Sequence, residues 1–299
     1  MPELPDILLY LSALRPRIVG RRVEKIRLAS PFLLRSIDPP LAAVEGRAIV
    51  DLHRLGKRIA MEAEGELFLV FHLMIAGRLR WKEPGTKIPG KVGLLALDFE
   101  HGTLILTEAG TRRQASLHVV SGREELAQHN PGGLEVLEAD LAAFSSALTT
   151  ENHTVKRALT DPHIFSGIGN AYSDEILHAA RMSPFKQTQS LTADEIRQLY
   201  DATRVTLRKW IDALRQQAGD EFPEKVTAFR EEMAVHGRYG KPCPDCGSPV
   251  QRVVYAANEA NYCATCQTGG RLLADRSLSR LMKDDWPRTL EELERKRRG

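Results

Sequence analysis

The stretch CPDCGSPVQRVVYAANEANYCATC occupies residues 243–266 and holds all four cysteines of the chain. Its pattern is C-x2-C, sixteen residues, then C-x2-C. Two such turns can each present two thiolates to one tetrahedral ion, and the spacing is typical of structural zinc. Two disulfides, the alternative, would require an oxidising compartment. We therefore predict a small finger with one structural zinc ion and no fifth ligand nearby, held by Cys243, Cys246, Cys263 and Cys266.

The composition is that of a soluble folded protein with two or three modules. The chain has 299 residues, of which 42% are hydrophobic and 27% charged. Its longest strongly apolar stretch, 67–75, is shorter than the roughly 20 residues that cross a bilayer. The start, MPELPD, has neither the basic nor the apolar region of a signal peptide. We therefore expect no membrane insertion and a cytoplasmic location, associated with the nucleoid in a bacterium. The net charge of +3 permits a nucleic-acid partner without requiring one.

Residues 1–121 are predicted to form a β-sandwich domain with a leading helix. Leu8, Leu11 and Ile18 recur at helical spacing ahead of Gly20. Short β-branched and alternating runs then follow, separated by Gly, Pro and acidic turns, as in sandwiches and barrels. The runs are 24–28, 48–52, 67–73, 93–99 and 103–107. Residues 122–139, which include a Pro-Gly-Gly turn, are predicted to be a linker.

The second half of the chain is predicted to be helical up to the finger. Apolar faces recur at 140–148, 155–159, 171–181 and 193–217, which places a helical domain at 140–235 and the finger at 236–267. The stretch DPHIFSGIGN, at 161–170, is a double turn leading into a helix. Such a turn can bind a phosphate through backbone N–H groups, or can be an ordinary helical hairpin. Residues 268–299 form a basic extension, with an amphipathic helix expected over 271–283 and a solvated charged end.

The first residues of the chain suggest covalent chemistry. Pro2 becomes the N-terminus once Met1 is removed, as the small side chain of Pro2 favours. A secondary amine of this kind can attack an electrophilic sugar carbon and form an iminium. An α-amine is also much less basic than a lysine side chain, and Glu3 beside it could carry protons. The alternative is a simple helix start, in which acidic residues favour the positive end of the helix.

Several separated motifs together resemble the formamidopyrimidine-DNA glycosylase and endonuclease VIII family. The resemblance covers about residues 2 to 267 and rests on the order and spacing of the motifs. They are Pro2-Glu3-Leu4-Pro5, Leu55-Gly56-Lys57, His72-Leu73 with Gly77, Val155-Lys156, Gly167-Ile168-Gly169-Asn170, and Gly237-Arg238 with Gly240 ahead of Pro242-Cys243. The resemblance implies a multidomain α+β fold with a β-sandwich, a helix-two-turn-helix domain and a four-cysteine zinc finger.

The same resemblance implies roles for individual residues. Pro2 corresponds to the Schiff-base nucleophile that attacks C1′ of the damaged nucleoside, and Glu3 to the acid/base that assists opening of the sugar ring. Lys57 corresponds to a strand-borne lysine that contacts the phosphate during elimination. The family places DNA between the sheet and helical domains and flips the lesion out of the stack. DNA-binding residues are then expected at Arg35, His72, Arg112, Arg113, Lys156, Asn170 and Asn258.

The sequence also departs from the family pattern. Asn258 stands five residues before the third cysteine, where relatives usually carry a phosphate-binding arginine, so the final elimination step is in question. Arg252 or Arg271 is the alternative source of that charge. The residues that fill the gap left by the flipped base also differ: Met74 follows His72-Leu73 directly, and the 110–114 stretch lacks an aromatic residue.

Two functions follow from these residues. The first is a monomeric base-excision repair enzyme, a DNA glycosylase with AP lyase activity, that acts on damaged, oxidised bases in double-stranded DNA. The second is a protein on the same scaffold that binds damaged or abasic DNA with little or no catalysis. Retention of Pro2, Glu3 and Lys57 together favours the enzyme, whereas Asn258 is compatible with the binding protein.

Overall fold

The computed structural model describes the chain apart from residues 111, 225, 228–229, 256–257, 275–286 and 299. The described residues divide into two compact units. The first unit comprises Met1–Gly132 and Arg208–Ala228, and the second comprises Gly133–Leu207 and Phe229–Gly299. In the part of the chain that the structure describes, no helix is both long enough and apolar enough to cross a membrane.

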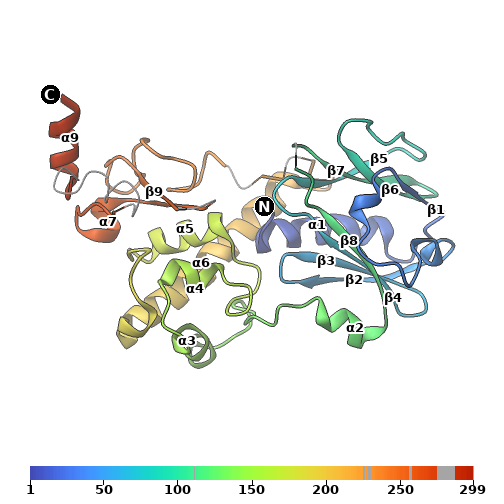
Figure 1. Cartoon of the computed structure of the whole chain (residues 1–299), viewed down its shortest axis with the longest axis horizontal. Coiled ribbons are helices and arrows are strands. Elements are labelled where there is room, and N and C mark those ends of the chain that lie inside the picture. The colour runs from blue at the N-terminus through green and yellow to red at the C-terminus, as the bar shows by residue number, and fades with distance from the viewer. Residues whose placement is uncertain (111, 225, 228–229, 256–257, 275–286, 299) are drawn as a thin grey trace. The chain divides into compact units, whose positions relative to one another are not determined.

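The first unit is a β-sandwich with a helix in its core. Helix α1 (Leu4–Ile18) packs against one of two four-stranded sheets, and every neighbouring pair of strands is antiparallel (Figure 1). One sheet has the order β1 (Lys25–Leu28), β6 (Gly93–Phe99), β7 (Gly102–Glu108), β5 (Gly77–Lys82), and the other the order β2 (Ile49–Leu55), β3 (Arg58–Ala63), β4 (Leu67–His72), β8 (Ser116–Ser121). The predicted sandwich with a leading helix is therefore confirmed. Short 3-10 helices, η1 (Pro31–Leu33) and η2 (Leu41–Val44), precede β2.

Successive side chains of β4 point to opposite faces of the β2-β3-β4-β8 sheet, and both faces are buried there. Leu69 and Phe71 belong to the main core, which also holds α1. Phe68 and Val70 point to the opposite face, where they pack with Leu126. Leu126 lies on α2 (Gly122–Gln128), within the segment that the sequence predicts to be a linker. The linker prediction overlooked this helix because a single turn-forming glycine and one apolar residue give almost no periodic signal.

The second unit begins with short helices that start where their capping residues predict. The carboxylate of Asp140 accepts the Ala143 N–H at the start of α3 (Leu141–Thr149), and the Thr154 hydroxyl accepts the Arg157 N–H at the start of α4 (Val155–Thr160). The remaining elements are α5 (Asn170–Ala179), η3 (Thr188–Ser190), α6 (Ala193–Ala218), β9 (Gln251–Tyr255), β10 (Asn258–Tyr262), α7 (Ala264–Thr268) and α9 (Leu290–Arg298). The last part of α6 belongs to the first unit.

The described parts of the C-terminal extension fold back on the finger. The Leu272 N–H donates to the Arg288 carbonyl at 2.8 Å, and the Leu273 N–H donates to the Tyr262 hydroxyl at 2.8 Å. Leu272, Leu273 and Leu290 pack against the buried Tyr262. The helix predicted over 271–283 falls mostly outside the described residues, whereas the end predicted to be merely solvated contains α9.

Candidate functional site

The chain's start is held inside the first unit. Pro2 is buried and Glu3 is 2% exposed, because α1 begins at Leu4 and is buried along most of its length. The Glu3 N–H donates to a carboxylate oxygen of Asp6 at 3.0 Å, which fixes the first turn of the helix. Chain ends usually fray unless they are tied down. The predicted nucleophile and acid/base thus lie at a fixed and largely enclosed position.

Lys57 faces the same region from the tight turn between β2 and β3. Gly56 takes a left-handed conformation there, with φ of +60°, and Lys57 is the second turn residue, directly before the return strand begins at Arg58. Burial lowers the pKa of Lys57, and the nearby Glu3 carboxylate raises it. Burial also lowers the pKa of the Met1 amine, while Glu3 raises it and Arg78 lowers it. The chain end, Glu3 and Lys57 therefore interact electrostatically, as their predicted roles require.

A group of cationic and titratable side chains adjoins Lys57. Burial, together with the nearby Arg58, Lys57 and His118, lowers the pKa of His72 to about 4. Burial also lowers the pKa of His118, with contributions from His129, Arg58 and Arg35. His72 therefore interacts electrostatically with Lys57 and His118, and His118 interacts in the same way with Arg35. Arg35 and His72 are both among the residues predicted to bind DNA. Arg58 and His118 were not predicted from the sequence, since a strand residue gives no sign of which distant strand lies beside it.

Arg112 and Arg113 lie on an exposed loop that carries no aromatic residue. Both side chains are exposed, and Arg113 donates to the Lys91 carbonyl at 2.6 Å. The side chain of Asn258 falls outside the described residues, although its backbone belongs to β10. Arg252, the substitute cation suggested by the sequence, lies with its guanidinium 4.5 Å from the Tyr239 ring centre.

Lys156, one of the residues expected to bind DNA, is buried and paired inside the second unit. Its side chain is only 2% exposed, and its ammonium donates to Asp174 at 2.5 Å and to the Asn170 carbonyl at 2.8 Å. Burial and pairing of this ammonium argue against the phosphate contact expected of it. Lys156 instead holds the start of α5, where Asn170 is the first helical residue and half-buried. Of these two predicted DNA contacts, only Asn170 lies where solvent reaches it.

Two adjacent carboxylates on α5 hold the segment that leads into the finger. Glu175 accepts the backbone N–H groups of Ala234, Val235 and His236 at 2.7 to 3.0 Å. Asp174 also accepts from His236 Nδ1 at 2.8 Å and from the amide of Asn261, on β10, at 3.2 Å. The sequence did show an Asp-Glu pair directly after the double turn. It could not show that both carboxylates would be buried against residues some sixty positions away.

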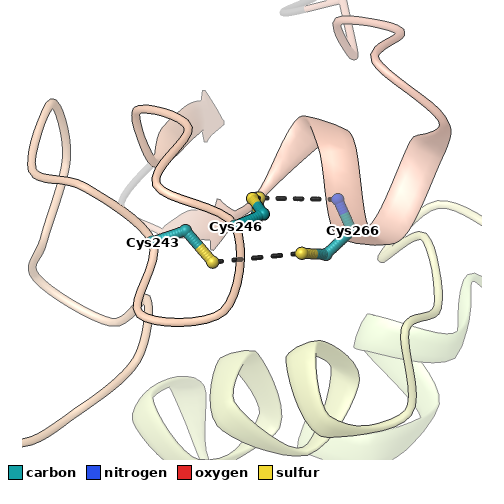
Figure 2. A group of neighbouring side chains, drawn as sticks. Cys243, Cys246 and Cys266 are labelled. Atoms are coloured by element: carbon teal, nitrogen blue, oxygen red, sulfur yellow. Dashed lines mark hydrogen bonds between the residues drawn. The ribbon is translucent and has the colours of Figure 1, made fainter.

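The four cysteines converge, as their spacing predicts. Their sulfur atoms lie within 4.8 Å of one another. The Cys243 and Cys266 sulfurs point toward each other at 4.0 Å (Figure 2), and those of Cys246 and Cys263 are 3.4 Å apart. These separations are far longer than the roughly 2.05 Å of a disulfide bond, so the disulfide alternative is excluded. Four thiolates in a compact cluster fit one tetrahedral zinc ion.

Comparison with known proteins matches all three parts of the chain. Residues 1–117 match the formamidopyrimidine-DNA glycosylase N-terminal domain, residues 133–220 the H2TH domain of the same enzymes, and residues 240–269 a zinc finger found in FPG and IleRS. The formamidopyrimidine-DNA glycosylase of Heliobacterium modesticaldum is 32% identical over 280 residues, which cover 89% of this chain and all of that protein. The chain belongs to the formamidopyrimidine-DNA glycosylase family.

Solved structures of the family superpose on this chain over the same range. The Thermus thermophilus protein is 31% identical with a TM-score of 0.74, and covers 89% of this chain and 98% of its own. Wild-type Lactococcus lactis FPG, solved with DNA that contains an oxidized pyrimidine, is 25% identical with a TM-score of 0.79, over 89% of this chain and all of its own. Membership confirms the predicted class, a DNA-binding base-excision repair glycosylase with the AP lyase activity typical of the family, and one structural zinc. Residues 270–299 lie beyond the family models.

Proposed function

We propose that Pro2, freed by removal of Met1, is the nucleophile of this glycosylase. Its nitrogen forms a bond to C1′ of the damaged nucleoside, and the bond from C1′ to the base breaks with its electron pair on the base. Loss of the proline N–H proton then leaves a neutral amine on C1′. The C1′–O4′ bond breaks next, O4′ takes its electron pair and a proton carried by Glu3, and the nitrogen lone pair forms the iminium with C1′. Elimination then removes a proton from C2′ and breaks the C3′–O bond, which releases the 3′ phosphate that Lys57 holds.

The observation that supports this proposal is the enclosed chain end beside Glu3 and Lys57. With Met1 present, burial already lowers the pKa of the terminal amine from its ordinary 8.0. Removal of Met1 leaves the Pro2 nitrogen at this same buried start of α1, where burial likewise disfavours the protonated amine. Since only the unprotonated amine attacks carbon, a lowered pKa increases its active fraction at neutral pH.

The remaining predicted contacts bind the DNA backbone on either side of the lesion. On the first unit His72 interacts with Lys57 and Arg35 interacts with His118, and Arg112 and Arg113 add charge on an exposed loop. On the second unit Asn170 lies at the start of α5, next to the double turn. Cationic contacts of this kind release counterions, so affinity should fall steeply with salt. Asn258 contributes no charge, which favours an altered elimination step.

The substrate is damaged double-stranded DNA, with oxidised bases as the class, in line with the oxidized pyrimidine bound to the L. lactis relative. The proposed catalytic residues all come from the first unit of one chain, so a monomer suffices. A cytoplasmic, nucleoid-associated location suits that substrate. Light scattering on the pure protein, with and without DNA, tests the monomer.

Borohydride trapping on abasic-site DNA tests the nucleophile. Intact mass first establishes that Met1 is absent. Wild-type protein and a Pro5→Ala control, which changes the other proline of the same segment, should both give a covalent adduct. Pro2→Glu, whose larger side chain retains Met1, should give none. An equal adduct with Pro2→Glu would overturn the assignment. No adduct from the wild type, together with tight binding of the same DNA, would favour the damage-binding protein instead.

A further inference from the structure

Helix α5 contacts the zinc finger through several polar side chains that lie on one side of it. Asp174 and Glu175 hold β10 and the segment before the finger, as described above. One turn further on, His178 reaches the first cysteine turn, and Arg181, just after the helix, pairs with Asp245 at 3.3 Å. The finger is therefore fastened to α5 at two places, one of which is next to the metal-binding sulfurs.

His178 makes the contact closest to the metal centre. Its Nε2 lies 3.3 Å from the Cys243 sulfur and 3.9 Å from the nearer carboxylate oxygen of Asp245. The His178 side chain is only 5% exposed, and Cys243 is 2% exposed. Cys266 also contributes a sulfur within 4.8 Å of both the imidazole nitrogen and the Asp245 carboxylate. The sequence gives no sign of this contact, because His178 lies 65 positions before Cys243.

The charge and coordination number of the zinc site indicate whether this imidazole is a ligand or a hydrogen-bond donor. A zinc ion bound by four thiolates carries a net charge of −2, and a buried charge of that kind requires N–H donors around the sulfurs. Four cysteines already complete a tetrahedral site, so a fifth ligand is not needed. The 3.3 Å separation fits a hydrogen bond to sulfur, and the shorter distance favours Cys243 over Asp245 as its acceptor.

We propose that His178 is an outer-shell residue of the zinc site, whose Nε2–H donates a hydrogen bond to the Cys243 thiolate and so couples zinc retention to helix α5. This positioning role rests on the zinc finger alone and is independent of the roles proposed for Pro2, Glu3 and Lys57.

Zinc transfer to a chromogenic chelator measures the proposed bond directly on the full-length, zinc-loaded protein. His178→Phe removes the donor and keeps a ring of similar size. We expect its zinc affinity to fall about 10-fold, the lower end of the range for lost outer-shell partners. His178→Gln, which retains an N–H donor, should restore most of the loss. His236→Phe is the matched control, since His236 is equally buried and its Nδ1 bonds the Asp174 carboxylate.

Cobalt substitution provides a second readout that general destabilisation does not reproduce. Wild-type protein should show the absorption of a four-thiolate Co²⁺ site, and His178→Phe should keep four thiolates while its sulfur-to-metal bands shift. A three-thiolate spectrum in the wild type would make His178 a ligand and overturn the proposal. Equal zinc affinities for wild type and His178→Phe would overturn it as well. Should His178→Phe fail to fold, His178→Gln against the wild type decides: a loss of 10-fold or more with Gln contradicts a donor role.

Discussion

Lys156 offers the sharpest test of the buried network on α5. We expect Lys156→Met to lower the free energy of unfolding of the second unit by about 3–5 kcal/mol, the cost of breaking a buried ion pair. The side chains are 2% and 0% exposed, so the Asp174 charge left behind stays buried with only His236 and Asn261 as side-chain donors among the described residues. The double variant Lys156→Met/Asp174→Asn removes both charges and should recover part of that loss.

Urea unfolding and a salt titration of DNA binding measure the two consequences. Lys186→Met is the control, because Lys186 forms an ion pair with Glu195 in the same unit but is 31% exposed, and should cost less than about 1 kcal/mol. A lysine that contacts a phosphate contributes about 0.9 to the slope of log K against log salt, and Lys156→Met should leave that slope unchanged. A loss of stability below about 1 kcal/mol, together with a slope reduced by about 0.9, would refute the structural role and restore the phosphate contact.

Three further predictions concern single side chains. The pKa of His72 is about 4 in the folded protein and 6.5 in the unfolded chain, so the unfolded chain binds a proton first and stability should fall as the pH drops from 6.5 to 4. His72→Asn should flatten that part of a series of melting temperatures measured against pH. A pH dependence equal to that of the wild type would contradict a buried neutral imidazole. Gly77→Ala should destabilise the first unit by about 1–3 kcal/mol, since its Cβ would lie 2.2 Å from the Leu73 carbonyl oxygen; an unchanged melting temperature would show that this turn relaxes freely. Tyr262→Phe removes the acceptor of the Leu273 N–H and should lower the free energy of unfolding by about 1 kcal/mol. The Leu273 amide should then exchange its hydrogen faster. Equal protection of this amide in both proteins would mean that the hydrogen bond does not hold the extension.

Much of the candidate site could be predicted wherever a short stretch of chain carries its own chemistry. The cysteine spacing specifies a zinc finger because two knuckle turns build half a tetrahedron each. The first three residues offer an amine nucleophile with an acid beside it, and the other motifs of the family favour that prediction over a simple helix start. The helical spacing of apolar residues predicted α1 and most helices of the second unit, but it missed α2. The one buried residue of α2, Leu126, packs against residues of β4 and β8.

The sequence by itself therefore determined the family, the metal and the residue types of the active site. Only the tertiary structure decided which charged side chains face solvent and which are paired inside. Lys156 matches a DNA-binding motif, yet its partner Asp174 encloses it, and His178 belongs to no zinc motif, yet it meets Cys243. The physical reason is that local patterns fix helices, strands and turns, whereas contacts between residues 18 to 65 positions apart depend on how those elements pack.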